Sequence, residues 1–258
     1  MPAIHDVGPE GGPLLDLHLP GQGSGSGPWP VLTWSHGSAF RRDDGRRGAD
    51  AVAGVFNPLG IAVAGVAVRS SAQALFPAQR EDVAAALRFL REQGRRWSLD
   101  GRRVVTAGES SGGWAAAMGA LTTDLVAGAV AFYPPTDFLA MDAQAPPGAT
   151  LVHDDAGSPE SQLVGAAIRT VPELAREASP VSHVHPGAPP FLLVHGTLDE
   201  LVPAGQSRSL AQALERAGVE VAHVEVPDAG HGAWREWIGR DDVVRFVRTR
   251  LAAAPAAG

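Results

Sequence analysis

Short apolar runs alternate with longer amphipathic stretches along most of the chain. Runs rich in Val, Leu, Ile and Ala predict β-strands at residues 14–19, 31–35, 61–68, 103–107, 127–132, 191–194 and 219–226. Helical spacing is clearest at residues 77–93, where Val83, Ala86, Leu87 and Leu90 recur every three or four positions. Further helices are predicted at 111–120, 202–217 and 242–251. This alternation is typical of a mostly parallel sheet with crossover helices.

One segment between two predicted strands is longer than a single crossover helix requires. It covers residues 134–189, is rich in Pro and Gly, and contains two short helical patterns near 158–165 and 172–178. We interpret it as a small cap over the active face, inserted in one α/β domain that spans residues 1–258. No internal repeat is visible.

Composition excludes several kinds of chemistry. The chain has no Cys and no Lys, so disulfides, thiolate ligands, a Cys nucleophile and Schiff-base chemistry are excluded. A net charge of −7 argues against nucleic acid as a partner. The longest apolar runs are too short to cross a membrane, and the first residues, MPAIHDVGPEGG, show no secretory signal. We therefore expect a cytoplasmic location; the oligomeric state stays open.

The sharpest motif is GESSGG at residues 108–113, which stands directly between a predicted strand and a predicted helix. This is the context of a nucleophile elbow, in which a tight strand-to-helix turn presents a Ser hydroxyl above the sheet. The motif centres on Ser110, with Ser111 as the competing nucleophile. Gly108 and Gly112 leave room for the turn.

A Ser nucleophile needs a His base, and that base is oriented by a carboxylate. The segment FLLVHGTLD ends at Asp199, with Glu200 as its neighbouring rival, and the loop AGHG contains His231. Each follows a predicted strand, and the order Ser, Asp, His is the one that α/β-hydrolases use. Ser110, Asp199 and His231 are thus the predicted catalytic residues.

Together with the loop HGSAF at residues 36–40, these motifs resemble the α/β-hydrolase superfamily. The resemblance is closest to the serine esterase and carboxylesterase branch that includes feruloyl- and acetylxylan-esterase-like proteins. FPAQREDVAAALRFLR, YPPTDF, SPVSHV and APPFLLVHG are also typical of that branch, and the similarity covers residues 14 to about 250. It implies an eight-stranded, mostly parallel sheet with helices on both faces, Ser110 as nucleophile, His231 as base and Asp199 as the orienting acid.

The loop at residues 36–40, called the oxyanion loop below, departs from the HGGG or HGGA pattern of the family. Its backbone N–H groups are the expected donors to the oxyanion, so we predict Ser38 and Ser111 as donors and Gly37 as a third. Ser38 and Ala39 stand where the family often has glycine, and their side chains narrow the space beside the acyl carbon of the substrate. Three aromatic residues next to the motifs, Phe40, Trp114 and Trp234, are predicted to line the substrate pocket; for Trp114 a core position is the alternative.

Other polar residues are better explained without a catalytic role. Arg41 and Arg42 border the oxyanion loop and could attract an anion, but the Asp residues between the arginines favour a solvated face. Two short groups contain residues that can bind metals, His153-Asp154-Asp155 and His183-x-His185. Neither has a further metal-ligating residue at a spacing known from metal sites. We therefore expect neither a metal nor a cofactor.

The predicted function is hydrolysis of short-chain carboxylic esters, with a small-molecule ester as substrate. An amidase or peptidase, either arylformamidase-like or cleaving acyl-peptides, is the alternative within the enzymes because the same triad serves amides. A non-catalytic binding protein is the alternative outside them. Such a protein is expected to have lost a triad residue, whereas this chain keeps all three.

Overall fold

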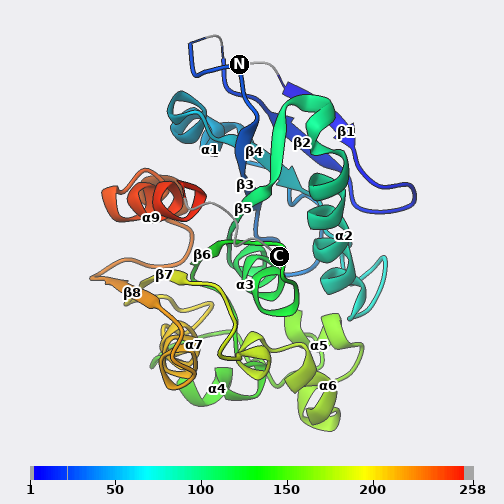
Figure 1. Ribbon diagram of the computed structural model, residues 1–258. Helices are drawn as coiled ribbons and strands as arrows, with labels where there is room; N and C mark the ends of the chain where they lie inside the picture. Colours follow the sequence, from blue (N-terminus) through cyan, green and yellow to red (C-terminus); the bar gives the residue numbers. More distant parts are fainter. Residues whose placement is uncertain (1–2, 22, 253–258) are drawn as a thin grey trace.

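The computed structural model describes residues 3–21 and 23–252, and an eight-stranded sheet runs through its centre (Figure 1). The strands are β1 (Ala3–Val7), β2 (Leu15–His18), β3 (Trp29–Ser35), β4 (Ala62–Val66), β5 (Leu99–Glu109), β6 (Gly128–Phe132), β7 (Phe191–Gly196) and β8 (Val221–Val226). Their order is β1-β2-β4-β3-β5-β6-β7-β8. β1 and β2 pair antiparallel, β2 pairs antiparallel with β4, and every pair from β4 to β8 is parallel.

Nine α-helices lie within the described residues. They are α1 (Ala49–Phe56), α2 (Ala78–Gln93), α3 (Ser111–Thr122), α4 (Met141–Gln144), α5 (Pro159–Val164), α6 (Pro172–Glu177), α7 (Gly205–Arg216), α8 (Trp234–Trp237) and α9 (Asp241–Ala252). Single 3₁₀ turns occupy Asn57–Leu59, Gly94–Trp97, Phe138–Ala140, Ile168–Thr170 and Pro180–His183.

Helices cover both faces of the sheet. Neighbouring residues of β3 point to opposite faces, so Val31 packs with the cluster that contains α2 and α3, whereas Leu32 packs with the cluster that contains α1 and α9. Figure 1 shows α1 and α9 on one side of the strands and α2 on the other. β4 and β6 are buried at every position, as expected for central parallel strands covered on both faces. The prediction of a mostly parallel eight-stranded sheet with helices on both faces is confirmed, and the fold is that of the α/β-hydrolases.

The structure adds four elements to the predicted set, namely β1, α1 and the one-turn helices α4 and α8. β1 was not predicted, because its sequence AIHDV is polar and the strand lies mostly exposed at the sheet edge. α1 was also missed, although Val52, Ala53 and Phe56 have helical spacing and are all buried. Its start is obscured by the Arg- and Gly-rich loop before it.

Residues 134–189 contain α4, α5 and α6, which all lie near the lower end of the molecule in Figure 1, α5 and α6 side by side and α4 next to α7. The two helices predicted near 158–165 and 172–178 correspond to α5 and α6. The segment packs on the body through buried apolar side chains, namely Phe138, Met141, Leu163, Val164, Ile168, Ala175 and Ala178.

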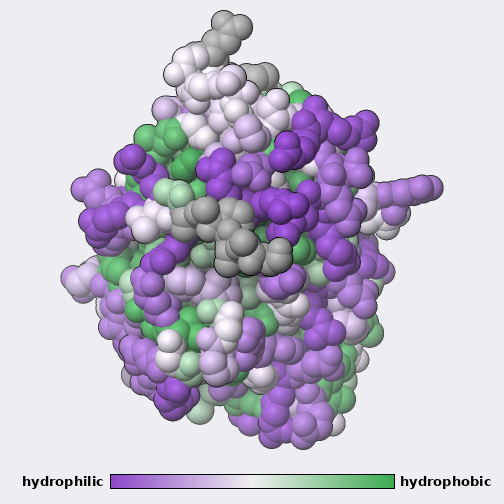
Figure 2. Space-filling model, viewed as in Figure 1, coloured by the Kyte–Doolittle hydropathy of each residue, from purple (hydrophilic) through white to green (hydrophobic). Residues whose placement is uncertain are grey.

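The surface seen in Figure 2 mixes hydrophilic and hydrophobic residues without one dominant apolar area. Large exposed apolar side chains among the described residues are scattered along the chain: Leu14, Leu59, Leu75, Val152, Leu198 and Leu201. Each helix within residues 3–21 and 23–252 is too short or too polar to span a lipid bilayer.

Candidate active site

Ser110 occupies the tight turn between β5 and α3. Its backbone has φ 54° and ψ −125°, a conformation that residues with a side chain rarely adopt. Close approaches shape the turn: a Cβ on Gly112 would lie 1.9 Å from the carbonyl oxygen of Ser35, and one on Gly108 would lie 2.2 Å from that of Gly112. The two glycines therefore permit a turn that the surrounding backbone holds in place.

His231 and Asp199 are directly hydrogen-bonded. His231 Nδ1 lies 2.7 Å from Asp199 Oδ2, with the Asp side chain fully buried and the imidazole partly exposed. Asp199 follows β7 and His231 follows β8, so both come from the carboxyl ends of neighbouring parallel strands. Because His231 lines the same pocket as Ser110, the structure brings all three predicted triad residues to one edge of the sheet.

The Asp199 carboxylate is surrounded by donors. Its Oδ1 accepts hydrogen bonds from the backbone N–H groups of Leu201 and Val202, at 2.9 and 2.8 Å. Burial favours the neutral acid, but hydrogen bonds from His195 and His231 outweigh it and hold the pKa of Asp199 well below its usual range. Asp199 is therefore ionised at neutral pH, as a residue that orients His231 must be.

His195 is a site residue that sequence reasoning missed. It is fully buried behind Asp199, with Nε2 3.4 Å from Asp199 Oδ2 and 2.9 Å from the carbonyl oxygen of Val202. Its Nδ1 lies 2.7 Å from Ser207 Oγ. Since a carbonyl oxygen only accepts, Nε2 carries a proton that faces Val202 and Asp199. The signal for it lies in the segment FLLVHGTLD, in which His195 stands four residues before Asp199.

Tyr133 is a second missed residue. Its ring lies 4.5 Å from the imidazole of His231, centroid to centroid, and it follows β6 in the segment YPPTDF. Burial raises the pKa of its phenol, so the side chain stays neutral beside the triad. Tyr133 thus packs against one side of the predicted base.

A pocket of about 370 Å³ borders Ser110 and His231. Three parts of the chain form its walls: the oxyanion loop with Arg41, the 134–189 segment, and the loops that follow β7 and β8. The residues that line the pocket are Ala39, Phe40, Arg41, Ser110, Ser111, Pro135, Thr150, Leu151, His153, Pro159, Glu160, Leu201, Val202 and His231. Phe40 is placed as predicted, in the wall of this pocket. The volume lies near the lower end of the range for small-molecule sites.

The N–H groups of the oxyanion loop differ from the expectation. Gly37 N–H donates to Glu109 Oε1 at 2.6 Å, and Ser38 N–H donates to Ser111 Oγ at 2.9 Å. The prediction of Gly37 as an oxyanion donor therefore needs correction, because a buried carboxylate already accepts from its amide. Ala39, expected only to narrow the space beside the acyl carbon, lines the pocket, and its N–H has no acceptor among the described residues.

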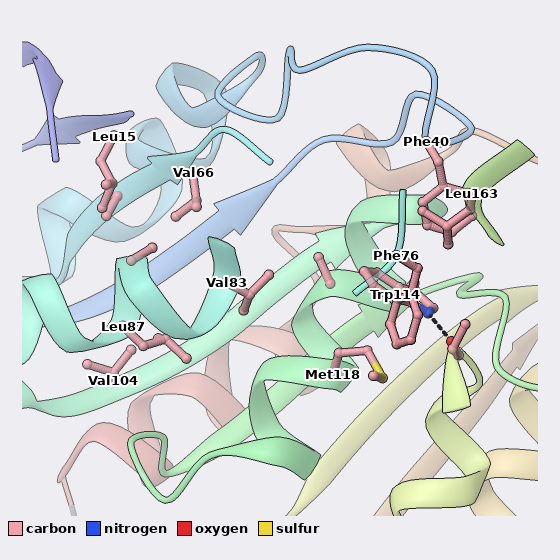
Figure 3. Packing of buried hydrophobic residues seen from close by; sticks show 14 of the residues in the cluster. Leu15, Phe40, Val66, Phe76, Val83, Leu87, Val104, Trp114, Met118 and Leu163 are labelled. Atoms are coloured by element: carbon pink, nitrogen blue, oxygen red, sulfur yellow. Dashed lines mark hydrogen bonds between the residues drawn. The ribbon is translucent and has the colours of Figure 1, made fainter. Parts of the chain in front are cut away.

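Trp114 and Trp234 do not line the pocket that contains Ser110. Trp114 is 1% exposed, donates from Nε1 to the carbonyl oxygen of Ala178 at 2.7 Å, and packs edge-to-face on Phe40 and Phe76 (Figure 3). It joins α3 to the 134–189 segment. The expectation that it lines the substrate pocket is wrong, and the alternative of a core position holds.

Trp234 is also a core residue, contrary to the prediction. Its ring lies 4.5 Å from that of Trp34, the side chain is 4% exposed, and the guanidinium of Arg235 covers it at 4.5 Å. α8 turns the ring toward the sheet, which a position close to His231 in the sequence could not reveal.

A histidine of each of the two groups considered as metal ligands is hydrogen-bonded within the protein. His153 Nδ1 lies 2.8 Å from Glu160 Oε2, and His183 Nε2 donates to the carbonyl oxygen of Glu177 at 2.7 Å. No group of three or more His, Asp or Glu residues within the described ranges is arranged to hold a metal ion.

A family profile described as BD-FAE matches residues 15–214, which is more than half of the chain. The chain belongs to the BD-FAE family. This BD-FAE chain is 29% identical over 233 residues to the esterase LipQ of Mycobacterium tuberculosis, covering 87% of the chain and 53% of that protein. It is 27% identical over 221 residues to the probable carboxylic ester hydrolase LipM of the same organism, covering 80% and 50%. The BD-FAE chain spans about half the length of these curated relatives.

Solved structures share the fold of this BD-FAE chain. A truncated carbohydrate esterase from gut microbiota superposes with a TM-score of 0.87 at 24% identity, covering 98% of this chain and 97% of that one. A carboxyl esterase 2 from the fungus Tuber melanosporum gives a TM-score of 0.75 at 22% identity, covering 97% and 85%. These likenesses establish the α/β-hydrolase fold.

Proposed function

We propose that the protein hydrolyses short-chain carboxylic esters through an acyl-enzyme on Ser110. The observation that carries this proposal is the buried Asp199 carboxylate hydrogen-bonded to His231, which shares a pocket with a Ser on a strained strand-to-helix turn. The names of the curated relatives, an esterase and a probable carboxylic ester hydrolase, support the same reaction class.

In the first half of the reaction, Ser110 Oγ attacks the ester carbonyl while His231 Nε2 accepts the hydroxyl proton. Asp199, bonded to Nδ1, keeps the ring in the required tautomer and stabilises the imidazolium. The tetrahedral intermediate then collapses, the C–O bond to the alcohol breaks, and His231 returns the proton to the leaving oxygen. The acyl group stays on Ser110.

In the second half, His231 takes a proton from water as the water oxygen attacks the acyl carbon. Collapse of the second intermediate returns that proton to Ser110 Oγ and releases the carboxylic acid. Every acid, base and donor is a group of the chain itself, so the proposal uses no cofactor.

The oxyanion of both intermediates needs backbone donors. Ser111 N–H stands at the first position of α3 with no helical partner, and Ala39 N–H has no acceptor among the described residues; both residues border the pocket. Ser38 N–H becomes a third donor when Ser111 Oγ turns away from it. We assign the oxyanion hole to these three amides.

The preference for short acyl chains rests on the size of the pocket and on its walls. Besides the catalytic residues, the rigid rings of Pro135 and Pro159 and the aromatic ring of Phe40 line the pocket. A volume of about 370 Å³ holds an acetyl to butyryl ester with a small alcohol. Acyl chains of eight or more carbons should lose at least about tenfold in kcat/KM, equivalent to about 1.4 kcal/mol.

A panel of aryl acetate, butyrate and octanoate esters, with the matching anilides, tests the proposal. We expect turnover of the short esters, a decline at octanoate and far slower cleavage of the anilides. A serine-directed phosphonate should block activity and add one adduct, which peptide mass spectrometry locates at Ser110. Faster cleavage of the anilides, or an adduct elsewhere, would contradict the proposal.

A further inference from the structure

The wall of the pocket contains a buried charged pair that plays no part in the triad. His153 and Glu160 both come from the 134–189 segment, line the pocket with Ser110, and are 2% and 3% exposed. His153 Nδ1 lies 2.8 Å from Glu160 Oε2. Buried ionisable side chains are rare unless they are paired, and this pair stands in the wall of the proposed substrate site.

The proton positions follow from the acceptors around His153. Its Nε2 lies 3.1 Å from the carbonyl oxygen of Leu201, which only accepts, so Nε2 carries a proton. Nδ1 faces a carboxylate oxygen. Burial lowers the pKa of His153, but the hydrogen bond and charge of Glu160, together with the charge of Asp142 and the carbonyl of Leu201, outweigh burial and raise it. The protonated form of His153 is thus favoured beside Glu160.

The second oxygen of Glu160, Oε1, has no partner within the part of the chain that the structure describes. Oε1 makes no hydrogen bond or ion pair with any residue in the described ranges. Oε1 is also not fully sealed from solvent, so it borders open space. The open space that Glu160 lines is the pocket. A carboxylate oxygen therefore faces the substrate volume with its hydrogen-bonding capacity unused.

α5, the short helix that carries Glu160, is held firmly at several points. Arg41 donates from Nε to Gln162 Oε1 at 2.9 Å and from Nη2 to the carbonyl oxygen of Gly157 at 2.8 Å. The hydroxyl of Ser158 caps the helix by accepting from Ser161 N–H at 3.0 Å. These contacts tie α5 to the oxyanion loop. The Glu160 carboxylate is consequently oriented before a substrate arrives, and this reduces the conformational entropy that is lost on binding.

We propose that Glu160 Oε1 accepts a hydrogen bond from a hydroxyl group of the ester substrate and selects hydroxyl-bearing esters over otherwise identical ones. This inference rests on the proposed ester hydrolysis. An unpaired carboxylate oxygen beside apolar groups such as Leu151, Pro159 and Val202 gains most from a ligand that donates a hydrogen bond.

The charges around Glu160 favour a neutral donor over a cationic one. His153 already balances the charge of Glu160, and Arg41 adds a positive charge to the lining of the same pocket. An ammonium group would meet this excess of positive charge, whereas a hydroxyl group uses the free oxygen without adding charge.

Two pairs of substrates test the inference on either side of the scissile bond. Propyl acetate and 2,3-dihydroxypropyl acetate differ only by hydroxyls on the alcohol, and ethyl butyrate and ethyl 3-hydroxybutyrate differ only by one on the acyl chain. The readout is the ratio of kcat/KM within each pair. In the wild-type protein we expect the hydroxylated member of at least one pair to be favoured by about tenfold or more, because a hydrogen bond to a charged group is worth that much. The pair that shows it assigns the subsite to the alcohol or the acyl side.

Glu160→Gln should reduce that ratio to about threefold or less, because its amide oxygen accepts the hydrogen bond from His153 and its NH2 group, which donates rather than accepts, then faces the pocket. Glu173→Gln is the matched control: Glu173 lies in the same segment with its side chain 88% exposed, and its replacement should leave the ratio unchanged. If Glu160→Gln does not fold, Glu160→Asp, which withdraws the oxygen by one methylene, should show the same loss.

The outcomes separate this inference from the proposed function. If the wild-type protein hydrolyses none of the four esters, the proposed function fails. If it hydrolyses them with no hydroxyl preference, or if Glu160→Gln lowers both members of a pair equally, ester hydrolysis stands and Glu160 is only a structural partner of His153. That result would overturn the inference.

Discussion

The carboxylate of Glu109 accepts a hydrogen bond from the backbone N–H of Gly37 across 2.6 Å. Glu109 directly precedes Ser110, and Gly37 directly precedes Ser38, so one short bond ties the nucleophile elbow to the oxyanion loop. The approach is close: a Cβ on Gly37 would lie 2.6 Å from that of Ser110. Since Glu109 is 5% exposed, little water competes for the bond. The relative position of nucleophile and oxyanion donors therefore depends on it.

Glu109→Ala should lower kcat for phenyl acetate by about 10- to 100-fold, with a smaller effect on KM. Removing one oxyanion donor outright typically costs 10²–10³ in kcat, and a displaced loop costs somewhat less. Glu109→Gln keeps an acceptor for the Gly37 amide and should recover much of the loss. Steady-state kinetics of both variants provides the measurement. Equal losses in the two variants would argue against a positioning role.

Ser110→Ala should remove nearly all turnover while the protein stays folded. Loss of a triad nucleophile costs on the order of 10⁶ in kcat in a comparable system, and only one hydroxyl is deleted. Ser111→Ala is the control, because its hydroxyl accepts from Ser38 N–H but does not attack the substrate in the proposed mechanism. The hydrolysis rate and the far-UV circular dichroism of both variants should be compared. More than about a hundredth of wild-type activity in Ser110→Ala would shift the assignment to Ser111.

The His153–Glu160 pair should make stability depend on pH in a defined direction. The pKa of His153 is raised in the folded protein, so its contribution is fully present below the unfolded value of about 6.5 and is lost as pH rises through the folded value. The difference in unfolding free energy between the wild type and His153→Gln should thus be larger at pH 6 than at pH 9. Urea denaturation at both pH values measures it. A difference that grows with pH would mean that His153 is neutral in the folded protein.

Trp114→Phe should destabilise the protein by about 1–3 kcal/mol and leave the chemistry largely intact. The change removes the hydrogen bond from Nε1 to Ala178, leaves a buried carbonyl without its donor, and opens a small void. Urea denaturation gives the loss of stability, and kcat for phenyl acetate shows whether the site is affected. Unchanged stability together with a large rise in KM would return Trp114 to the substrate pocket.

The residues that the sequence located well are those whose role depends on local chain geometry. A strand, a Gly-flanked Ser and a small-residue helix together form the elbow, and the sequence signal for this turn lies within residues 108–113 and the two elements beside them. Asp199 and His231 were located by the same logic, since each follows a strand of the parallel sheet and such strands deliver their loops to one edge. The strand pattern likewise predicted the sheet, apart from the polar edge strand β1.

Only the tertiary structure decided which way the neighbouring side chains and amides turn. Trp114 and Trp234 stand beside motif residues in the sequence, but α3 and α8 direct both rings into the core. Gly37 offers its N–H to Glu109, a residue far away along the chain. The pairing of His153 with Glu160 also depends on how the 134–189 segment folds over the pocket. Local patterns specify where the chain turns, whereas burial and long-range hydrogen bonds depend on contacts that form only when distant segments pack together.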